Sequence, residues 1–495
     1  MFKVGVDVGG TFTDVLLVNS ANSEFFTAKV PSTPSDSSIG VLNGIEKACE
    51  LAGVDLKDID VVTHGTTVAT NAILTGQGAK VGLVTSKGYG QVLQIARSYV
   101  PGGLGGWLYY QKTPPLAPLD CTVEIDERTA ADGSIVSELN MVKARRSITK
   151  LAEKNVEAIT ICLINSFSND IHEKKLRELV QEMLPNIPTS ISSEVIPEMQ
   201  EYERTITTVA NSYVRPQVEN YISNLQKEFD NRMDGASLSI LRSDGGLATA
   251  ASAMNFPVYM LMSGPAGGVS GAMWVGEQAG FNNIITFDMG GTSTDVALIE
   301  NGHALVRRET TVGDVTVRAS ALDVRSIGAG GGSIAHVPEL TRALRVGPES
   351  AGAEPGPAAY DKGGAEPTVT DANVVLGYLP ETQKLGGDMA IRKELAEKAV
   401  QKIADALGLT LLEAAEGIIK IVNEKMFGAV RLVSVEKGYD PRDFSLMAFG
   451  GAGPLHANAL GALTQAWPVV IPPGPGILCA YGDATTRLRN EASKT

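Results

Sequence analysis

One nine-residue pattern occurs twice in this chain and constrains its fold more than any other feature. Residues 7–15 have the sequence D-V-G-G-T-F-T-D-V, and residues 288–296 have the sequence D-M-G-G-T-S-T-D-V. The offset of 281 residues is the length of a domain and far exceeds a solenoid repeat. Each copy lies between two β-rich apolar runs and so predicts a hairpin with a tight polar turn. We therefore expect two related lobes.

The residue types in this pattern suit the binding of a phosphate and a hard cation. Glycine has no Cβ, so the backbone can come within hydrogen-bond distance of a phosphate, and neighbouring threonine hydroxyls add donors. An aspartate at the end of the preceding strand can hold Mg2+ through water. A single copy would be ordinary turn chemistry. Two copies a domain apart favour a phosphate clamp with one hairpin from each lobe.

Length and composition exclude several classes of protein. A chain of 495 residues with 43% hydrophobic content is too long for one compact core, so at least two domains are expected. The net charge of -14 argues against binding to nucleic acid. The four cysteines form no CxxC pair, which favours a reducing compartment, and Cys162 lies in an apolar run typical of a buried structural thiol. With no secretory signal and no membrane-length apolar stretch, we expect a cytoplasmic protein.

Periodicity along the chain indicates alternating α and β elements. Residues 141–156 and 172–184 are expected to be helices around a buried strand at 158–164, and a charged helix at 198–231 precedes a strand at 238–241. The breaker-rich segment 101–118 is expected to be a long loop over a site. Residues 327–333 and the following segment 346–357 have the composition of a linker, but Ile, Val and Ala interrupt the glycines and no Ser repeat appears, which favours an ordered loop.

The C-terminal part predicts a nucleotide cradle. Residues 393–434 show long helical periodicity, and the strand 446–449 ends in G-G-A-G-P at residues 450–454. A helix is then expected to start near Leu455. Glycines at such a strand-to-helix turn let an adenine or ribose lie flat against the backbone.

Four sequence blocks together resemble one protein family. They are H-G-T-T-V-A-T-N-A at residues 64–72, S-G-P-A-G-G at 263–268, F-D-M-G-G-T-S-T-D at 287–295 and G-G-A-G-P-L-H at 450–456. In this order they resemble the hydantoinase A/5-oxoprolinase family, within the superfamily of actin, sugar kinases and the heat-shock chaperone ATPase. The resemblance implies an α/β fold with two RNase H-like, actin-like lobes and a nucleotide cleft between them. We expect a first lobe at 1–200 and a second at 201–495, without the family's usual C-terminal region.

The resemblance also implies ATP and Mg2+ as cofactors and assigns residues to them. Asp7 and Asp288 are expected to organise Mg2+ through water, and Gly450, Gly451 and Gly453 are expected to face the nucleoside. The residues expected to bind the phosphates are Gly9, Gly10, Thr11, Thr13, Gly290, Gly291, Thr292 and Thr294. Asp14 and Asp295 suit either a functional role or the closing of their own hairpins.

Further candidates lie in the 64–72 block. Thr66, Thr67 and Asn71 are neutral donors suited to anchoring a phosphate or a substrate carbonyl, and an N-cap role for the threonines is an equal alternative. His64 and His456 are more typical of structural histidines. The chain departs from the family in having Arg325 where a histidine is usual and Tyr360 where a cysteine is usual.

The implied activity is ATP-dependent hydrolysis of a cyclic amide, such as hydantoin, 5-oxoproline or a related lactam or imide. Phosphorylation of the carbonyl oxygen would overcome the resonance that makes an amide a poor electrophile. The chain has five histidines and no H-x-H or H-E-x-x-H pattern, so a hydantoinase B-type partner subunit is expected to carry the water-activating metal site. The alternatives are a subunit of an ATP-dependent ketone carboxylase and a truncated, non-catalytic actin-like ATPase module. A sugar kinase fits less well, because no segment suggests a sugar-binding base.

Overall fold

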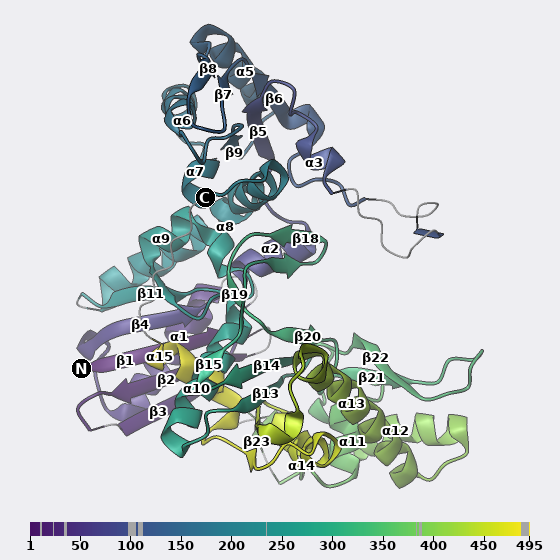
Figure 1. Ribbon diagram of the computed structural model, residues 1–495. Helices are drawn as coiled ribbons and strands as arrows, with labels where there is room; N and C mark the ends of the chain where they lie inside the picture. Colours follow the sequence, from purple (N-terminus) through teal and green to yellow (C-terminus); the bar gives the residue numbers. More distant parts are fainter. Residues whose placement is uncertain are drawn as a thin grey trace.

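The computed structural model describes residues 1–9, 12–22, 24–33, 37–97, 105–106, 112–233, 235–382, 384–385, 389–486 and 495. It is an α/β structure with three main sheets (Figure 1), which confirms the predicted fold class. Within the described residues, no helix is both long and apolar enough to cross a membrane.

The first sheet contains the first hairpin. Its strand order is β12-β11-β4-β1-β2-β3. β1 pairs antiparallel with β2 and parallel with β4, which in turn pairs parallel with β11. Helix α1 (Ser37–Ala52) packs against β2 and β3. The strands are β1 (Phe2–Val8), β2 (Phe12–Asn19), β3 (Glu24–Pro31), β4 (Ile59–Gly65), β11 (Ser237–Leu241) and β12 (Leu247–Thr249).

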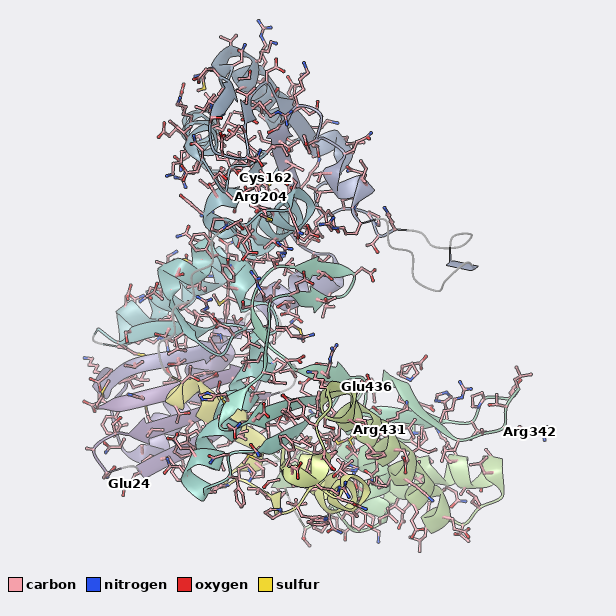
Figure 2. The ribbon with its side chains drawn as sticks, in the orientation of Figure 1. Glu24, Cys162, Arg204, Arg342, Arg431 and Glu436 are labelled. Atoms are coloured by element: carbon pink, nitrogen blue, oxygen red, sulfur yellow. The ribbon has the colours of Figure 1, made fainter. Side chains whose placement is uncertain are left out.

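A separate parallel sheet is inserted between β4 and β11 and forms the upper part of the molecule in Figure 1. Its strand order is β10-β9-β5-β6, and helices α5 (Met141–Glu153) and α6 (Ile171–Met183) confirm the predicted helices around the buried strand β9. Cys162 is buried here, where Thr205 donates a hydrogen bond to its sulfur, and it lies next to Arg204 in Figure 2. The strands are β5 (Val81–Ser86), β6 (Thr122–Ile125), β9 (Ala158–Cys162) and β10 (Thr189–Ile191).

The second hairpin lies in a sheet that repeats the pairing of the first. β13 pairs antiparallel with β14 and parallel with β25, as β1 does with β2 and β4. The main strand order is β15-β14-β13-β25-β26, and β20 also pairs with β14. This repetition is what two related lobes require. The strands are β13 (Ile284–Met289), β14 (Thr294–Glu300), β15 (His303–Ala304), β20 (Arg325–Ile327), β25 (Ser445–Phe449) and β26 (Val469–Val470).

The long helical segment predicted at 393–434 is two helices. α12 (Lys393–Leu407) ends at Gly408, which adopts the left-handed conformation, and α13 (Leu411–Val433) starts after Thr410. The Thr410 hydroxyl accepts from the Glu413 amide while the Glu413 carboxylate accepts from Thr410, which is a capping box. These two signals end one helix and begin the next within three residues. α14 (Gly453–Thr464) follows the glycine turn after β25.

The glycine-rich helix α10 (Ser263–Ala279) and the short helix α15 (Leu478–Thr485) lie at the junction of the two hairpin sheets. They pack against each other, and α15 also packs on β1. A Cβ on Gly482 would lie 1.8 Å from the Gly267 carbonyl oxygen, and one on Gly5 would lie 2.1 Å from that of Ala480. Only glycine permits these approaches, so the junction is built from backbone against backbone.

The first sheet extends beyond the division predicted between residues 200 and 201. α8 (Glu201–Arg232) begins at that point, but β11 and β12 after it return to the first sheet because β11 pairs with β4. The assignment of 1–200 and 201–495 to two lobes therefore does not coincide with the sheets. α15 crosses back in the same way, from the end of the chain to β1.

Shorter elements complete the described part of the chain. They are α2 (Val68–Thr75), α3 (Val92–Ile95), β7 (Arg128–Thr129), β8 (Ile135–Ser137), α7 (Ser192–Val195), α9 (Ala250–Asn255), β16 (Val306–Arg307), β17 (Thr310–Val312), β18 (Val315–Val317), β19 (Ala321–Leu322), β21 (Ser333–His336), β22 (Arg345–Ser350), α11 (Val369–Val375), β23 (Lys384–Leu385) and β24 (Met389–Ala390). The predicted loop at 101–118 falls largely outside the described residues, and its covering role stays a prediction.

Candidate functional site

The two hairpins have matching turns. The amide of Gly9 donates to the carbonyl of Phe12 at 3.0 Å, and the amide of Gly290 donates to that of Ser293 at 3.0 Å. Gly10 and Thr11 lie outside the described residues. In the second turn, nothing lies within 4 Å of a Cβ built on Gly291, and Thr292 is exposed. The second turn therefore leaves room for a ligand beside its backbone.

Asp7 and Asp288 occupy the same register position in the two hairpins. Asp7 pairs across the strands with Asp14, and Asp288 pairs with Asp295, so two carboxylates face each other in each hairpin. Burial raises the pKa of Asp7 to about 7, helped by Asp14. Burial raises the pKa of Asp288 to about 8, helped by Asp295 and by Asp7 from the other hairpin. Asp7 and Asp288 therefore belong to one cluster of buried carboxylates, in which each negative charge disfavours the others.

Asp14 and Asp295 have partners on the neighbouring strands. The ammonium of Lys29 lies 2.5 Å from Asp14, and the hydroxyl of Ser326 donates to Asp295. Lys29 lies on β3 and Ser326 on β20, so each aspartate ties its hairpin to the next strand. These contacts support the structural role for both residues.

Helix α15 adds two side chains to this centre that the sequence did not assign. The thiol of Cys479 lies 3.5 Å from Oδ2 of Asp288 and also favours the ionised form of Asp7. Burial and the surrounding carboxylates raise the pKa of Cys479, so the thiol is protonated and acts as a donor. Asp483 lies one turn further along α15, is 1% exposed, and has its pKa raised by burial and by Asp7. In the sequence, Asp483 could have been noticed as the one acidic residue among the mostly small or apolar residues of 478–485.

Glycines surround the carboxylate of Asp288. A Cβ on Gly450, which has a φ of 81°, would lie 2.2 Å from Oδ1, and one on Gly268 would lie 3.3 Å from Oδ2. Gly453 lies behind β13, whereas nothing lies within 4 Å of a Cβ on Gly451. Of the three glycines expected to face a nucleoside, Gly451 has open space, and Gly450 instead shapes the pocket of Asp288.

The glycine-rich segment 327–333 is ordered and packs on the second hairpin turn. The amides of Gly331 and Gly332 donate to the carbonyls of Gly290 and Gly291 at 3.0 and 2.6 Å. The hydroxyl of Thr294 donates to the carbonyl of Ala329 at 2.5 Å, and its side chain is fully buried. Thr294 therefore holds this loop against the turn, and its expected contact with a phosphate stays a prediction.

The hydroxyl of Thr13 also forms a hydrogen bond within the protein. Its side chain is fully buried, and its hydroxyl lies 3.0 Å from the hydroxyl of Ser32. Ser32 in turn donates to the carbonyl of Gly9 at 2.7 Å. Thr13 thus stabilises the first turn through Ser32, and its expected contact with a phosphate stays a prediction.

The Thr66, Thr67 and Asn71 cluster lies where β4 meets α2 and α10. The Thr66 hydroxyl accepts from the Val68 amide at 3.3 Å, which is a local capping contact. Thr67 is the N-cap residue of α2 but makes no side-chain cap bond, and Asn71 donates to its hydroxyl at 3.3 Å. The N-cap alternative thus fits Thr66 better than Thr67.

The start of α10 lies directly beside this cluster. The Ser263 hydroxyl donates to the carbonyl of Thr66 at 3.0 Å, and the Met262 amide donates to Thr70 at 3.0 Å. Two helix N-termini therefore converge next to Gly65, which pairs with Asp7 in the sheet. The partial positive charge of a helix N-terminus is suited to an anion or a polarised carbonyl.

The histidines that the sequence indicated are buried and hydrogen-bonded. His64 lies 3.1 Å from the Val6 carbonyl and 2.7 Å from the Tyr221 hydroxyl, and burial lowers its pKa to about 4. His456 lies 2.7 Å from Asn423, and burial lowers its pKa to about 4. Both arrangements fit neutral structural histidines.

The two departures from the family pattern lie outside this centre. Arg325 is exposed on β20 and lies 3.9 Å from Asp323, and Tyr360 packs against the core of the second lobe. Among the described residues, no group of three or more His, Cys, Asp or Glu side chains is placed to hold one metal ion directly.

Family models match nearly the whole chain. The model described as hydantoinase/oxoprolinase N-terminal region matches residues 3–184, and the model described as hydantoinase/oxoprolinase matches residues 204–492. The caprolactamase subunit alpha of Pseudomonas jessenii is 36% identical, over 100% of this chain and 71% of the relative. The acetone carboxylase beta subunit of Xanthobacter autotrophicus is 30% identical, over 99% of this chain and 70% of the relative.

Solved structures give the same result. The crystal structure of the ATP-dependent caprolactamase from Pseudomonas jessenii aligns with a TM-score of 0.85 and 37% identity, over 98% of this chain and 71% of that one. The nucleotide-free structure of acetone carboxylase aligns with a TM-score of 0.84 and 29% identity, over 98% of this chain and 70% of that one.

Proposed function

The chain belongs to the hydantoinase/oxoprolinase family, and from this premise we propose that it is the ATP-binding subunit of an enzyme that opens a cyclic amide. The names of relatives include an ATP-dependent caprolactamase, a 5-oxoprolinase and an acetone carboxylase whose carboxylation is ATP-dependent. An ATP-dependent enzyme is therefore supported at the level of the family. The cyclic amide is our choice within that range.

The convergence of Asp7 and Asp288 carries the proposal. Each belongs to a separate hairpin, yet Asp7 raises the pKa of Asp288, and the Cys479 thiol contacts Asp288 while favouring the ionised form of Asp7. Clustered carboxylate oxygens with raised pKa values are suited to a hard divalent cation, which would offset their mutual repulsion. These residues fit Mg2+ bound largely through water.

The turns beside the aspartates fit the phosphates of ATP. Gly291 and Gly451 have open space, and Thr292 is exposed next to the second turn. We assign phosphate contacts to Gly9, Gly290, Gly291 and Thr292, and a nucleoside contact to Gly451. Bound ATP would transfer its γ-phosphoryl group to the amide oxygen and leave as ADP. Water would then add to the activated carbon, the C–N bond would break with a proton passing to the ring nitrogen, and hydrolysis of the resulting acyl phosphate would release phosphate.

The Thr67 and Asn71 side chains and the converging helix N-termini supply neutral donors on the other side of Asp7. We propose that they orient the substrate carbonyl towards the phosphates. Preorganised donors of this kind stabilise a developing negative charge without rearranging during the reaction. Thr66 shapes the turn through its contact with the Val68 amide.

A partner subunit belongs to this proposal. Several relatives are named as subunits, including the alpha subunit of caprolactamase and the beta subunit of acetone carboxylase. We propose that a hydantoinase B-type subunit provides the water-activating metal site, and that the complex acts in the cytoplasm.

The test is ATP hydrolysis by the purified chain, alone and with a co-expressed hydantoinase B-type subunit. The substrates are 5-oxoproline, hydantoin, caprolactam, and acetone with bicarbonate. Release of ADP stimulated by one cyclic amide, only with the partner and not with Asp288→Asn, would support the proposal. Absence of ATP binding by the wild-type chain would refute it.

A ketone carboxylase subunit is the second candidate, because acetone carboxylase aligns with a TM-score of 0.84. Stimulation by acetone with bicarbonate alone would favour it. If ATP binds and no compound stimulates turnover, the chain is better described as a non-catalytic ATPase module.

A further inference from the structure

Asp483 is a buried carboxylate without a protein partner to neutralise it. It lies on α15 and is 1% exposed, and neither oxygen has a hydrogen-bond partner of ordinary geometry. The Gly65 backbone favours its ionised form, but burial and Asp7 outweigh this effect on its pKa. A buried carboxylate of this kind needs water or a ligand to satisfy its oxygens.

Glycines lie close to the carboxylate of Asp483 on two sides. A Cβ on Gly65 would lie 3.2 Å from Oδ2, and one on Gly267 would lie 3.0 Å from Oδ1. Glycine at both positions keeps side chains away from the carboxylate. No lysine, arginine or histidine within the described residues forms an ion pair with it.

The carboxylate faces the aspartate that the proposed function assigns to Mg2+. Gly65 pairs with Asp7 in the register of β4 and β1, and Asp7 raises the pKa of Asp483. The close packing of α15 on β1 and α10 fixes this position. The backbone contacts of α15 with β1 and with α10 therefore fix Asp483 next to Asp7.

We propose that Asp483 is an outer-sphere residue of the divalent cation, accepting hydrogen bonds from waters bound to the metal beside Asp7. This inference rests on the proposed function. It agrees with the absence, among the described residues, of three acidic, histidine or cysteine side chains placed to coordinate one ion directly. Mg2+ keeps several of its waters, and those waters need acceptors. Asp483 is a positioning residue, because it acts through water.

The experiment measures metal binding separately from catalysis. Mn2+ is titrated into the purified chain with saturating ADP, and free Mn2+ is followed by its electron paramagnetic resonance signal. Asp483→Asn keeps the shape of the side chain and removes its charge. We expect it to weaken Mn2+ binding about tenfold, as loss of an outer-sphere partner does. ADP binding in EDTA should stay unchanged.

Two further variants make the result decisive. Thr486→Val, three residues further along at the end of α15, alters another buried polar group without a partner and should bind Mn2+ like the wild type. Asp483→Ala repeats the test if the asparagine variant does not fold. Wild-type Mn2+ affinity in a folded Asp483 variant would overturn the inference while leaving the proposed function intact. Failure of the wild-type chain to bind ADP and Mn2+ would instead remove the proposed function.

Discussion

Replacement of Asp288 by asparagine should stabilise the metal-free protein and abolish its response to Mg2+ and ATP. Burial, the cross-strand neighbour Asp295 and Asp7 raise the pKa of Asp288 to about 8. In the unfolded chain these groups are absent, and the carboxyl keeps a pKa near 3.8. Folding at neutral pH therefore imposes on Asp288 either a proton or an unfavourable charge. Asparagine carries neither cost.

The size of the effect follows from the two pKa values. At pH 7 the folded protein holds a proton that the unfolded chain has released, at a cost of about 1.4 kcal/mol per pH unit, which amounts to about 4 kcal/mol. Asp288 is only half-buried, and screening by solvent makes the real cost smaller than this value. We expect a gain of about 2 kcal/mol in the free energy of unfolding. Because the folded pKa is raised, the gain is largest above pH 8 and vanishes as the pH falls towards 4.

Urea denaturation in EDTA at pH 5, 7 and 8.5 measures this gain. Asp405→Asn, on the exposed face of α12, is the control and should leave stability unchanged at each pH. The wild type should gain stability on addition of Mg2+ and ATP, whereas Asp288→Asn should not. A variant less stable than the wild type at pH 8.5, or a difference that does not depend on pH, would refute the electrostatic argument.

Four further changes test other parts of the structure by urea denaturation. Burial lowers the pKa of His64 from 6.5 to about 4. The free energy of unfolding should therefore be highest above pH 6.5 and fall by about 3 kcal/mol as the pH drops to 4, because the folded protein disfavours the protonated imidazole. This pH-dependent fall should be smaller in His64→Gln. Gly482→Ala places a Cβ 1.8 Å from the Gly267 carbonyl oxygen and should lower the free energy of unfolding by at least about 2 kcal/mol. This variant should also lose the stabilisation that Mg2+ and ATP give the wild type. Gly428→Ala, exposed within α13 with nothing nearby, should instead stabilise by about 0.5–1 kcal/mol. Arg204→Met removes a buried partner of Glu201 and should cost about 3–5 kcal/mol, and an unchanged unfolding midpoint would contradict this.

Local patterns in the sequence predicted most of the elements. The two hairpins follow from alternating apolar residues around a glycine turn, and the helices at 141–153 and 171–183 follow from their periodicity. Pairing between distant strands is not a local property. The return of β11 to the first sheet was therefore not predictable from segment 237–241 alone. The break at Gly408 and Thr410 was visible as a cap signal, but the periodicity continues on both sides of it.

The candidate site was predictable where it rests on the repeat. The duplicated pattern implied that Asp7 and Asp288 are equivalent, and the structure brings both to one centre. The directions of hydroxyl groups were not predictable from the sequence. In the structure, the hydroxyls of Thr13 and Thr294 form hydrogen bonds with other parts of the protein. Cys479 and Asp483 were missed because their contact with β1 depends on the path of the whole chain.

The position of α15 has a consequence for the order in which the site can form during synthesis. β1 ends at Val8 and α15 begins at Leu478, so about 470 residues separate the emergence of the two elements. At about 5–20 residues per second, the first hairpin waits roughly 25–95 s on the ribosome before Cys479 and Asp483 can reach it. Throughout that interval Gly5 and its neighbours expose a bare strip of backbone where the helix will later lie. A nascent chain can thus fold its inserted parallel sheet early, but it acquires the complete acidic centre only after α15 has been synthesised.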